Sequence, residues 1–210
     1  FDGVGRERRS LSIMPAELVD FFIKYYAKAG DVYLDPFMGQ GIQLQVAALR
    51  GLEYHGYDIC ERFVEFIQHV CQKIQPTTAR PLRATLGDSR HPDTIPDGIG
   101  DFSFHSPPYW DVEYYGDEPE QLGEVPTYAE FLALIGEVAR AWLPKFKSGA
   151  FHVVNVHDLR RDGVFYCYHA DLLREFVAAG WVAHDIWIIE NLVSGLSKMF
   201  AARRVHQRVA

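Results

Sequence analysis

Apolar residues recur along the chain with two different periods, one typical of helices and one typical of strands. In residues 15–29, Leu18, Phe21, Phe22 and Tyr25 follow the three- and four-residue spacing of an amphipathic helix. The segment DVYLD that follows is short and has an apolar centre, which is typical of a buried strand. A helix followed by a buried strand is the first unit of a pattern that continues along the chain.

Strand-like and helix-like segments alternate as far as residue 189. The expected strands are 31–35, 53–58, 82–88, 100–104, 150–156 and 181–189, and the expected helices after the first are 41–51, 61–75, 127–143 and 168–180. Thr127, with Glu130 three residues later, predicts a capping box at the start of the longest helix. Strands that alternate with helices are joined by right-handed crossovers, so we expect an α/β fold with a mostly parallel sheet and helices on both faces.

Composition limits the class of protein. The 210 residues are 48% hydrophobic, without repeats or a long linker, which favours one domain over residues 1–210. No apolar run approaches the roughly 18 residues of a membrane span, so no membrane partner is expected. The three cysteines have neither a disulfide framework nor a metal-binding spacing, which favours a reducing, cytoplasmic location and no metal site.

The charge distribution gives no general attraction to nucleic acid, because the formal net charge is −7. Any such contact must therefore be local. Basic residues form clusters that are either solvated surface or a phosphate-binding face: Arg6, Arg8, Arg9, Arg160, Arg161, Lys198, Arg203, Arg204 and Arg208.

The ends of the expected strands carry the candidate chemistry. The first strand ends in LDPFMGQG, the second in GYDI, the third in GDSR and the fourth in HSPPYW. In a parallel sheet of this class ligands bind beyond the carboxyl ends of the strands, so one cleft could collect all four segments.

The loop DPFMGQG has two glycines, Gly39 and Gly41, which allow positive φ and a close approach of a ligand to the backbone. Asp58 ends the next strand about 20 residues later, where an acid accepts the ribose hydroxyls of nucleotide-like ligands. The structural alternatives are a tight turn for the loop, a helix cap for Asp58 and a turn residue for Asp88.

The corner HSPPYW contains adjacent prolines, which fit neither a helix interior nor a central strand. Together, DPFMGQG and SPPYW resemble the D-P-F-x-G-x-G and [DNS]-P-P-[YFW] motifs of the S-adenosylmethionine-dependent amino-methyltransferases of DNA bases, and the resemblance extends from about Ser12 to Trp187. It implies a Rossmann-like methyltransferase fold and S-adenosylmethionine as cofactor.

The resemblance also implies a role for each residue of the two motifs. The cofactor's methionine part is assigned to Asp35 and the loop glycines, its ribose to Asp58 and its adenine to Asp88. The full set of expected cofactor contacts is Asp35, Pro36, Phe37, Gly39, Gly41, Asp58 and Asp88, with Ser12 and Met14 upstream.

Catalysis is assigned to Ser106, Pro107, Pro108 and Tyr109. Ser106 Oγ and the Pro107 carbonyl would accept the two N–H groups of an exocyclic amine, and the prolines fix the direction of that carbonyl. Tyr109 would stack with a base flipped out of DNA, and the methyl group would move in line without a metal. The serine form of the motif is associated with N4 of cytosine, the kind of modification found in restriction-modification systems.

Some features depart from the family pattern. We find no space for a target-recognition domain, so target choice is relaxed or comes from a second subunit or a missing segment, and the final strand of the family's sheet has no counterpart before residue 210. The alternatives are an N6-adenine DNA methyltransferase, an RNA N-methyltransferase and a cofactor-binding module without catalysis. We interpret His105, His157 and His169 as structural residues.

Overall fold

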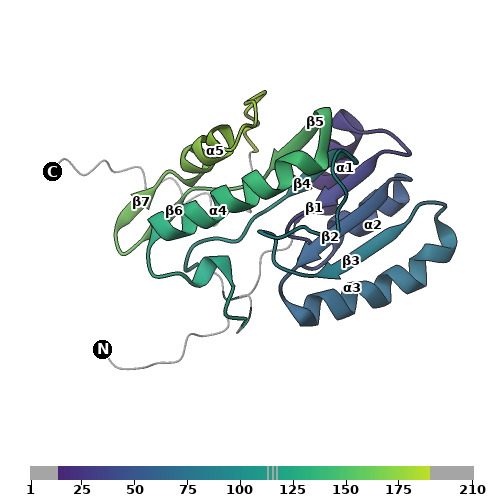
Figure 1. Cartoon of the computed structure of the whole chain (residues 1–210), viewed down its shortest axis with the longest axis horizontal. Helices are drawn as coiled ribbons and strands as arrows, with labels where there is room; N and C mark the ends of the chain where they lie inside the picture. Colours follow the sequence, from purple (N-terminus) through teal and green to yellow (C-terminus); the bar gives the residue numbers. More distant parts are fainter. Residues whose placement is uncertain (1–13, 113, 115, 117, 190–210) are drawn as a thin grey trace, which may run out of the picture.

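The computed structural model of the chain describes residues 14–112, 114, 116 and 118–189 (Figure 1). Five strands form a fully parallel sheet in the order β3-β2-β1-β4-β5. Their bounds are β1 Val32–Asp35, β2 Glu53–Asp58, β3 Leu82–Leu86, β4 Gly100–His105 and β5 Phe146–Val154. The strand order reverses at β1, which lies between β2 and β4, so the ligand cleft expected at the carboxyl ends belongs beside β1.

Helices cover both faces of the sheet, which confirms the predicted α/β class. On one face α1, α2 and α3 pack Phe22, Leu44 and Ile67 around Tyr33, and on the other α4 and α5 pack Trp142 and Leu172 near Leu34. The helices are α1 Ala16–Tyr26, α2 Ile42–Leu49, α3 Glu61–Ile74, α4 Tyr128–Trp142 and α5 Tyr168–Ala178, with 3₁₀ turns at Gln75–Thr77, Leu122–Glu124 and Leu143–Lys145.

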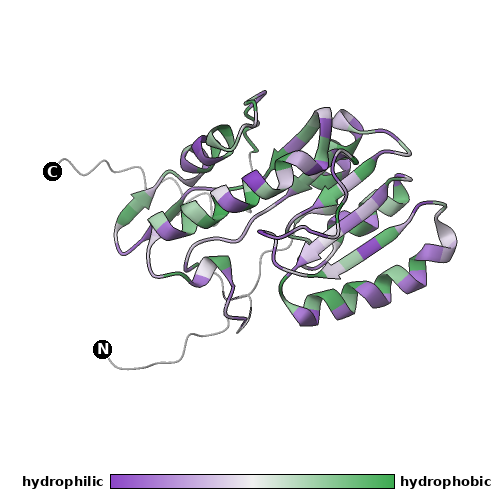
Figure 2. Ribbon diagram, in the orientation of Figure 1, coloured by the Kyte–Doolittle hydropathy of each residue, from purple (hydrophilic) through white to green (hydrophobic). Residues whose placement is uncertain are grey.

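Local sequence explains where these helices begin and how they are oriented. Figure 2 shows hydrophilic and hydrophobic residues alternating around α3, as expected for a helix with one face on the sheet. The predicted capping box of α4 is confirmed, because the Thr127 hydroxyl accepts the Glu130 N–H at 3.2 Å and the Glu130 carboxylate accepts the Thr127 N–H at 3.0 Å. Within the described ranges, no helix has the length and apolarity to cross a membrane.

The prediction of a sixth strand at 181–189 is wrong, because this segment has no strand structure. Its two tryptophans pack instead on helices. Trp181 donates to the Ala139 carbonyl of α4 at 2.9 Å, and Trp187 donates to the Tyr26 hydroxyl of α1 at 2.9 Å. Trp187 is 41% exposed and so is not a core residue. The apolar pattern was real, but the ladder partner that a strand requires does not occur among the described residues.

A short antiparallel hairpin, which the sequence reading missed, follows β5. It consists of β6 Leu159–Arg161 and β7 Val164–Tyr166, joined by Asp162 and Gly163. Both turn residues have positive φ, 49° and 82°, which is the geometry of a two-residue hairpin turn whose twist matches the strands. The hairpin brings the segment after β5 back to the start of α5.

Candidate active site

A cleft of about 1180 Å³ opens at the carboxyl end of the sheet. Its walls include the loop after β1, the end of β2, the corner after β4 and residues 155–157 after β5. The cavity continues along β5 towards α5 and residues 181–187. The volume of about 1180 Å³ therefore includes this extension as well as the part next to β1. The strand-end segments that were expected to meet therefore share one cavity.

Nine of the predicted site residues line this cleft and three do not. Those that line it are Met14, Phe37, Gly39, Asp58, Asp88, Ser106, Pro107, Pro108 and Tyr109. The three that lie behind the wall are Asp35, Pro36 and Gly41. Ser12 lies outside the described residues.

Asp35 is completely buried and organises the loop after β1. One of its oxygens accepts the Tyr54 hydroxyl at 2.7 Å and the other accepts the Phe37 N–H at 3.0 Å. Burial raises the pKa of the Asp35 carboxyl to about 7, against the hydrogen bonds that favour the charged form. Pro36 is held behind Asp35, where its carbonyl accepts the Ser89 hydroxyl.

The two loop glycines have different surroundings. Gly39 has a φ of 47°, and a Cβ placed on it would meet no atom within 4 Å, so the backbone here is open to the cleft. Gly41 has a φ of 73°, and its Cβ would lie 2.2 Å from the Ile67 side chain of α3. Gly39 therefore leaves room for a ligand, whereas Gly41 allows α2 and α3 to pack closely.

Asp58 connects the ends of β1 and β2. Its carboxylate accepts the Gly39 N–H at 2.9 Å and the Cys60 N–H at 2.9 Å, and burial raises its pKa above the usual range. The alternative in which Asp58 is the N-cap residue of α3 is not what the structure shows. The N-cap residue is Cys60, whose side chain makes no cap hydrogen bond. A carboxylate has about four lone-pair positions, so these two bonds leave Asp58 able to accept ligand hydroxyls.

Asp88 follows β3 and forms a salt bridge with Arg90. The guanidinium Nε donates to its carboxylate at 2.9 Å and the Arg90 N–H donates at 2.8 Å. Burial opposes ionisation of Asp88, but the bonds from Arg90 outweigh it and hold the pKa of Asp88 below its ordinary value. The turn role considered for Asp88 is therefore present, and the side chain still reaches the cleft.

The proline corner is fixed by contacts from α5 and from the segment after β5. The Tyr168 hydroxyl donates to the Pro108 carbonyl at 3.3 Å, while Pro107 is buried and Ser106 is half-buried at the cleft wall. These contacts hold the corner in one orientation, so its side chains enter the cleft with little freedom to lose on binding.

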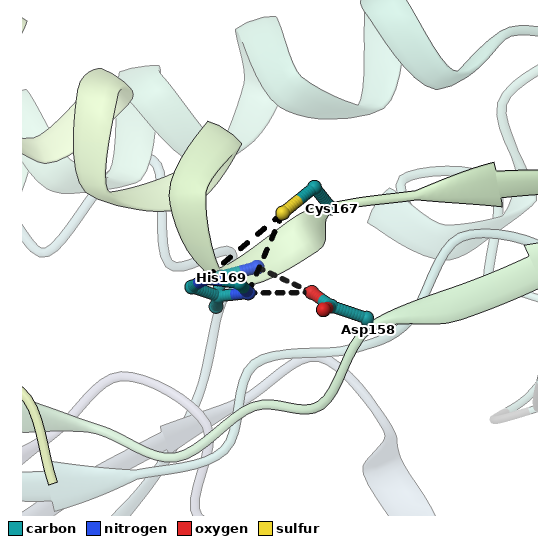
Figure 3. A group of neighbouring side chains, drawn as sticks. All are labelled: Asp158, Cys167 and His169. Atoms are coloured by element: carbon teal, nitrogen blue, oxygen red, sulfur yellow. Dashed lines mark hydrogen bonds and ion pairs between the residues drawn. The ribbon is translucent and has the colours of Figure 1, made fainter. Parts of the chain in front are cut away.

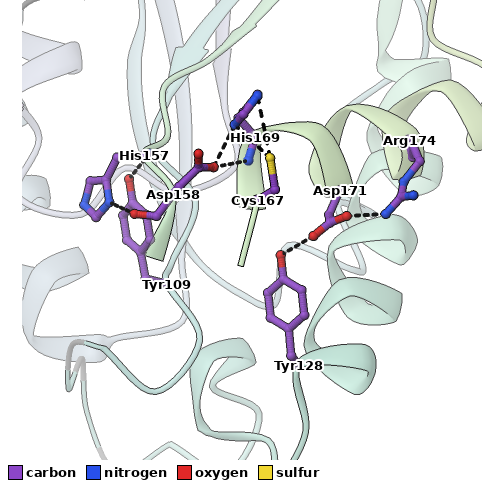
Figure 4. Close-up of polar contacts among 8 residues, drawn as sticks. All are labelled: Tyr109, Tyr128, His157, Asp158, Cys167, His169, Asp171 and Arg174. Carbon is purple, nitrogen blue, oxygen red and sulfur yellow. Dashed lines mark hydrogen bonds and ion pairs between the residues drawn. The ribbon is translucent and has the colours of Figure 1, made fainter. Parts of the chain in front are cut away.

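Tyr109 already has an aromatic neighbour (Figure 4). The His157 ring stacks on it with centroids 4.4 Å apart and planes at 19°, and the His157 N–H donates to the Tyr109 hydroxyl at 3.1 Å. His157 is itself exposed. One face of the expected base-stacking residue is thus covered by a side chain that solvent can reach.

A buried histidine, His105, and a partly buried one, His152, lie next to the corner. The Nε2 atoms of His105 on β4 and His152 on β5 are 2.7 Å apart, so one ring donates to the other. Burial lowers the pKa of His152 to about 3 and that of His105 well below its usual value, so both rings are neutral. Both Nδ1 atoms are buried without a hydrogen-bond partner in the part of the chain that the structure describes.

The sequence reading missed some polar residues of the cleft. Asn155 directly follows β5, lines the cleft and donates to the Met14 sulfur at 3.8 Å. The rule that ligands lie beyond the carboxyl ends of strands applies to Asn155 and His157 as well as to the first four strands. Glu120 and Gln121 also line the cleft, and no pattern in the sequence indicated them.

Comparison with known proteins identifies the fold and one segment of the chain. A family model named N6_N4_Mtase and described as a DNA methylase matches residues 9–69, which include the DPFMGQG loop but not the SPPYW corner. This match covers less than a third of the 210 residues. No curated protein matches the chain.

The solved structures that resemble the chain share its Rossmann-like fold. A TehB-like SAM-dependent methyltransferase from Corynebacterium glutamicum has a TM-score of 0.51 at 13% identity, covering 77% of this chain and 71% of that one. The [4+2]-cyclase SpnF has a TM-score of 0.54 at 16% identity, covering 79% of this chain and 57% of that one. Of the solved proteins that the chain resembles, four, including SpnF, are much longer, and the chain spans 42% to 57% of their length. Because a cyclase is among them, the fold by itself does not define the reaction.

Proposed function

We propose that this chain transfers a methyl group from S-adenosylmethionine to the exocyclic amino group of a DNA base, with N4 of cytosine as the preferred target. The observation that carries the proposal is the meeting of the two motifs. β1 and β4 are neighbours in the sheet, and the DPFMGQG loop and the SPPYW corner at their ends both line one cleft. The DNA methylase match over residues 9–69, which contains the DPFMGQG loop, supports DNA as the substrate.

The residues at the cleft fit the proposed cofactor. Gly39 is open to the cavity, and the acids Asp58 and Asp88 line it, which suits a ligand with a sulfonium charge and ribose hydroxyls. Asp58 would accept the hydroxyls and Phe37 would pack beside the ligand. The cofactor supplies an electrophilic methyl group when it is bound.

Asp35 and Gly41 serve the same site from behind its wall. Asp35 holds the Phe37 N–H, Asp58 holds the Gly39 N–H, and Gly41 lets α2 start close to α3. We infer that Asp35, Pro36 and Gly41 determine the shape of the loop, and that Phe37, Gly39 and Asp58 make direct contact with the cofactor. This is a narrower set of direct contacts than the resemblance implies.

The corner would bind and orient the target amine. The nitrogen lone pair of an exocyclic amine is delocalised into the base, so acceptors that hold both N–H groups favour the more tetrahedral, more nucleophilic form. Ser106 Oγ and the Pro107 carbonyl are such acceptors. Because Tyr168 fixes the neighbouring Pro108 carbonyl, the direction of the corner is set before the base arrives.

His157 occupies the position that a stacked base would need on one face of Tyr109. A flipped base would therefore displace this exposed ring or stack beyond it. Unpairing and unstacking the base costs a few kcal/mol, and an aromatic contact of about 1 to 3 kcal/mol offsets part of it. N6-adenine transfer would use the same contacts, and the serine of the corner is the feature that favours cytosine.

The decisive experiment incubates the chain with labelled S-adenosylmethionine and unmodified DNA, followed by nucleoside mass analysis. We expect label in N4-methylcytosine, and we expect the Ser106→Ala chain to serve as the matched control with little label. Label in N6-methyladenine would show that adenine, and not cytosine, is the target base. Label only in added RNA would favour an RNA N-methyltransferase. Cofactor binding with no transfer to any nucleic acid would favour a binding module without catalysis.

A further inference from the structure

Three side chains of metal-ligand type meet beside the corner. Asp158 follows β5, Cys167 follows β7 and His169 lies in the first turn of α5, so the hairpin brings together residues from both of its ends (Figure 3). One ligand atom of each lies within 4.8 Å of the others. Asp158 and Cys167 are partly buried and His169 is exposed, so an ion can reach the group from solvent.

Two of the three separations between the ligand atoms are close to those of a tetrahedral metal site, and all three lie within 4.8 Å. Cys167 Sγ is 3.7 Å from His169 Nδ1, and Asp158 Oδ1 is 2.7 Å from the same nitrogen. Zinc bonds of about 2.3 Å to sulfur and about 2.1 Å to nitrogen or oxygen place neighbouring ligands about 3.4 to 3.7 Å apart. The sulfur and nitrogen are already at this separation. The nitrogen and oxygen need about 0.7 Å more, which is within the reach of side-chain rotation.

The ligand types select the class of metal. A thiolate, an imidazole and a carboxylate suit zinc and related transition metals, whereas Mg²⁺ and Ca²⁺ prefer oxygen ligands alone. Cys167 is the N-cap residue of α5, which places its side chain at the start of the helix that carries His169. Asp158 Oδ1 also accepts the His169 N–H at 3.2 Å, which orients its carboxylate towards the other two side chains.

We propose that Asp158, Cys167 and His169 form a zinc site that joins the segment after β5 to the start of α5. Three protein ligands leave a fourth position for water. The proposal goes beyond methyl transfer, because it concerns what holds the catalytic corner in place.

The residues adjacent to the three ligands connect this site with the corner. His157, which precedes Asp158, stacks on Tyr109, and Tyr168, which lies between the other two ligands, donates to the Pro108 carbonyl. Figure 4 shows His157 and Tyr109 together with Asp158, Cys167 and His169. Bound zinc would restrict the backbone on both sides of the corner, so its role is structural and it takes no part in the transfer step.

The simplest competing arrangement is an Asp158–His169 hydrogen bond with a nearby thiol and no metal affinity. To distinguish the zinc site from this arrangement, Zn²⁺ and Co²⁺ are titrated into the whole chain after treatment with a chelator. Binding is followed by calorimetry and absorption spectroscopy. We expect one ion per chain and a near-ultraviolet thiolate-to-cobalt charge-transfer band. Cys167→Ser should abolish the band and weaken zinc binding by at least about 100-fold.

Two further variants keep the test interpretable. His169→Gln changes an exposed side chain and should also weaken zinc binding, whereas Cys71→Ala removes a buried cysteine from α3 and should leave it unchanged. Far-ultraviolet circular dichroism verifies that each variant is folded. Absence of the charge-transfer band in the unmodified chain would overturn the proposal. So would a zinc affinity in Cys167→Ser and His169→Gln equal to that of the unmodified chain. Neither readout depends on methyl transfer, so this test can fail while the proposed function stands.

Discussion

The carboxyl group of Asp35 should make the stability of the folded chain depend on pH. It is fully buried, and burial raises its pKa from 3.8 to about 7. The folded chain therefore binds this proton more tightly than the unfolded chain. The contribution to stability is complete below about pH 4 and is lost as the pH rises to about 7.

The size of this effect follows from the same two pKa values. They differ by about 3 units, and each unit corresponds to about 1.4 kcal/mol, so the stability lost is about 4 kcal/mol. Asp35→Asn removes the titration but keeps the shape. The amide oxygen can still accept the Phe37 N–H, and the Tyr54 hydroxyl can turn to accept from the amide nitrogen.

The assay is urea unfolding, followed by circular dichroism, of both chains between about pH 4 and pH 8. Taking the difference between the two chains cancels the titration of the groups they share. We expect the unmodified chain to lose about 4 kcal/mol relative to Asp35→Asn over this range, and the exposed control Asp93→Asn to show no such difference. Parallel stability curves for the unmodified chain and Asp35→Asn would refute the reasoning.

Three further predictions concern the cleft itself. Asp58→Asn should weaken S-adenosylmethionine binding by about 10- to 100-fold in calorimetry, because it removes hydrogen bonds to a charged group; unchanged affinity in the folded variant would remove Asp58 from the site. Ser106→Ala should lower kcat by about 10- to 1000-fold with nearly normal cofactor affinity; undiminished single-turnover methylation would exclude the corner as the catalytic centre. His157→Ala should strengthen capture of the flipped base by uncovering Tyr109, as measured by KM for DNA; a higher KM would mean that His157 is part of the stacking wall.

The order of helices and strands could be predicted from the sequence because each element has its own apolar period. The five parallel strands and the capping box at Thr127 follow from local patterns. The segment 181–189 has an equally clear apolar pattern, but a strand needs a neighbour to pair with, and pairing is not a local property. The hairpin was missed although Asp162-Gly163 is a strong turn signal, because its strands are only three residues long.

The position of the cleft was also predictable, whereas the partners of its side chains were not. The carboxyl ends of parallel strands meet at one edge, so Asp58, Asp88 and Ser106 were expected in one cavity, and they share one. That Tyr54 would bond Asp35, or that His157 would stack on Tyr109, depends on side chains from different strands and loops. No spacing within one segment encodes such contacts.

The position of β1 between β2 and β4 has a consequence for the order in which the protein folds. β1 pairs with β2 across about 20 residues of chain but with β4 across 69 residues, from Tyr33 to Phe102. Because closing a longer loop loses more entropy, we expect β1, β2 and β3 to pair first and β4 to dock onto them later. During synthesis the DPFMGQG loop would exist well before the SPPYW corner emerges. The cleft would then be completed only after β4 and the segments that follow it have docked, so a chain arrested before β4 could carry the loop but not the site.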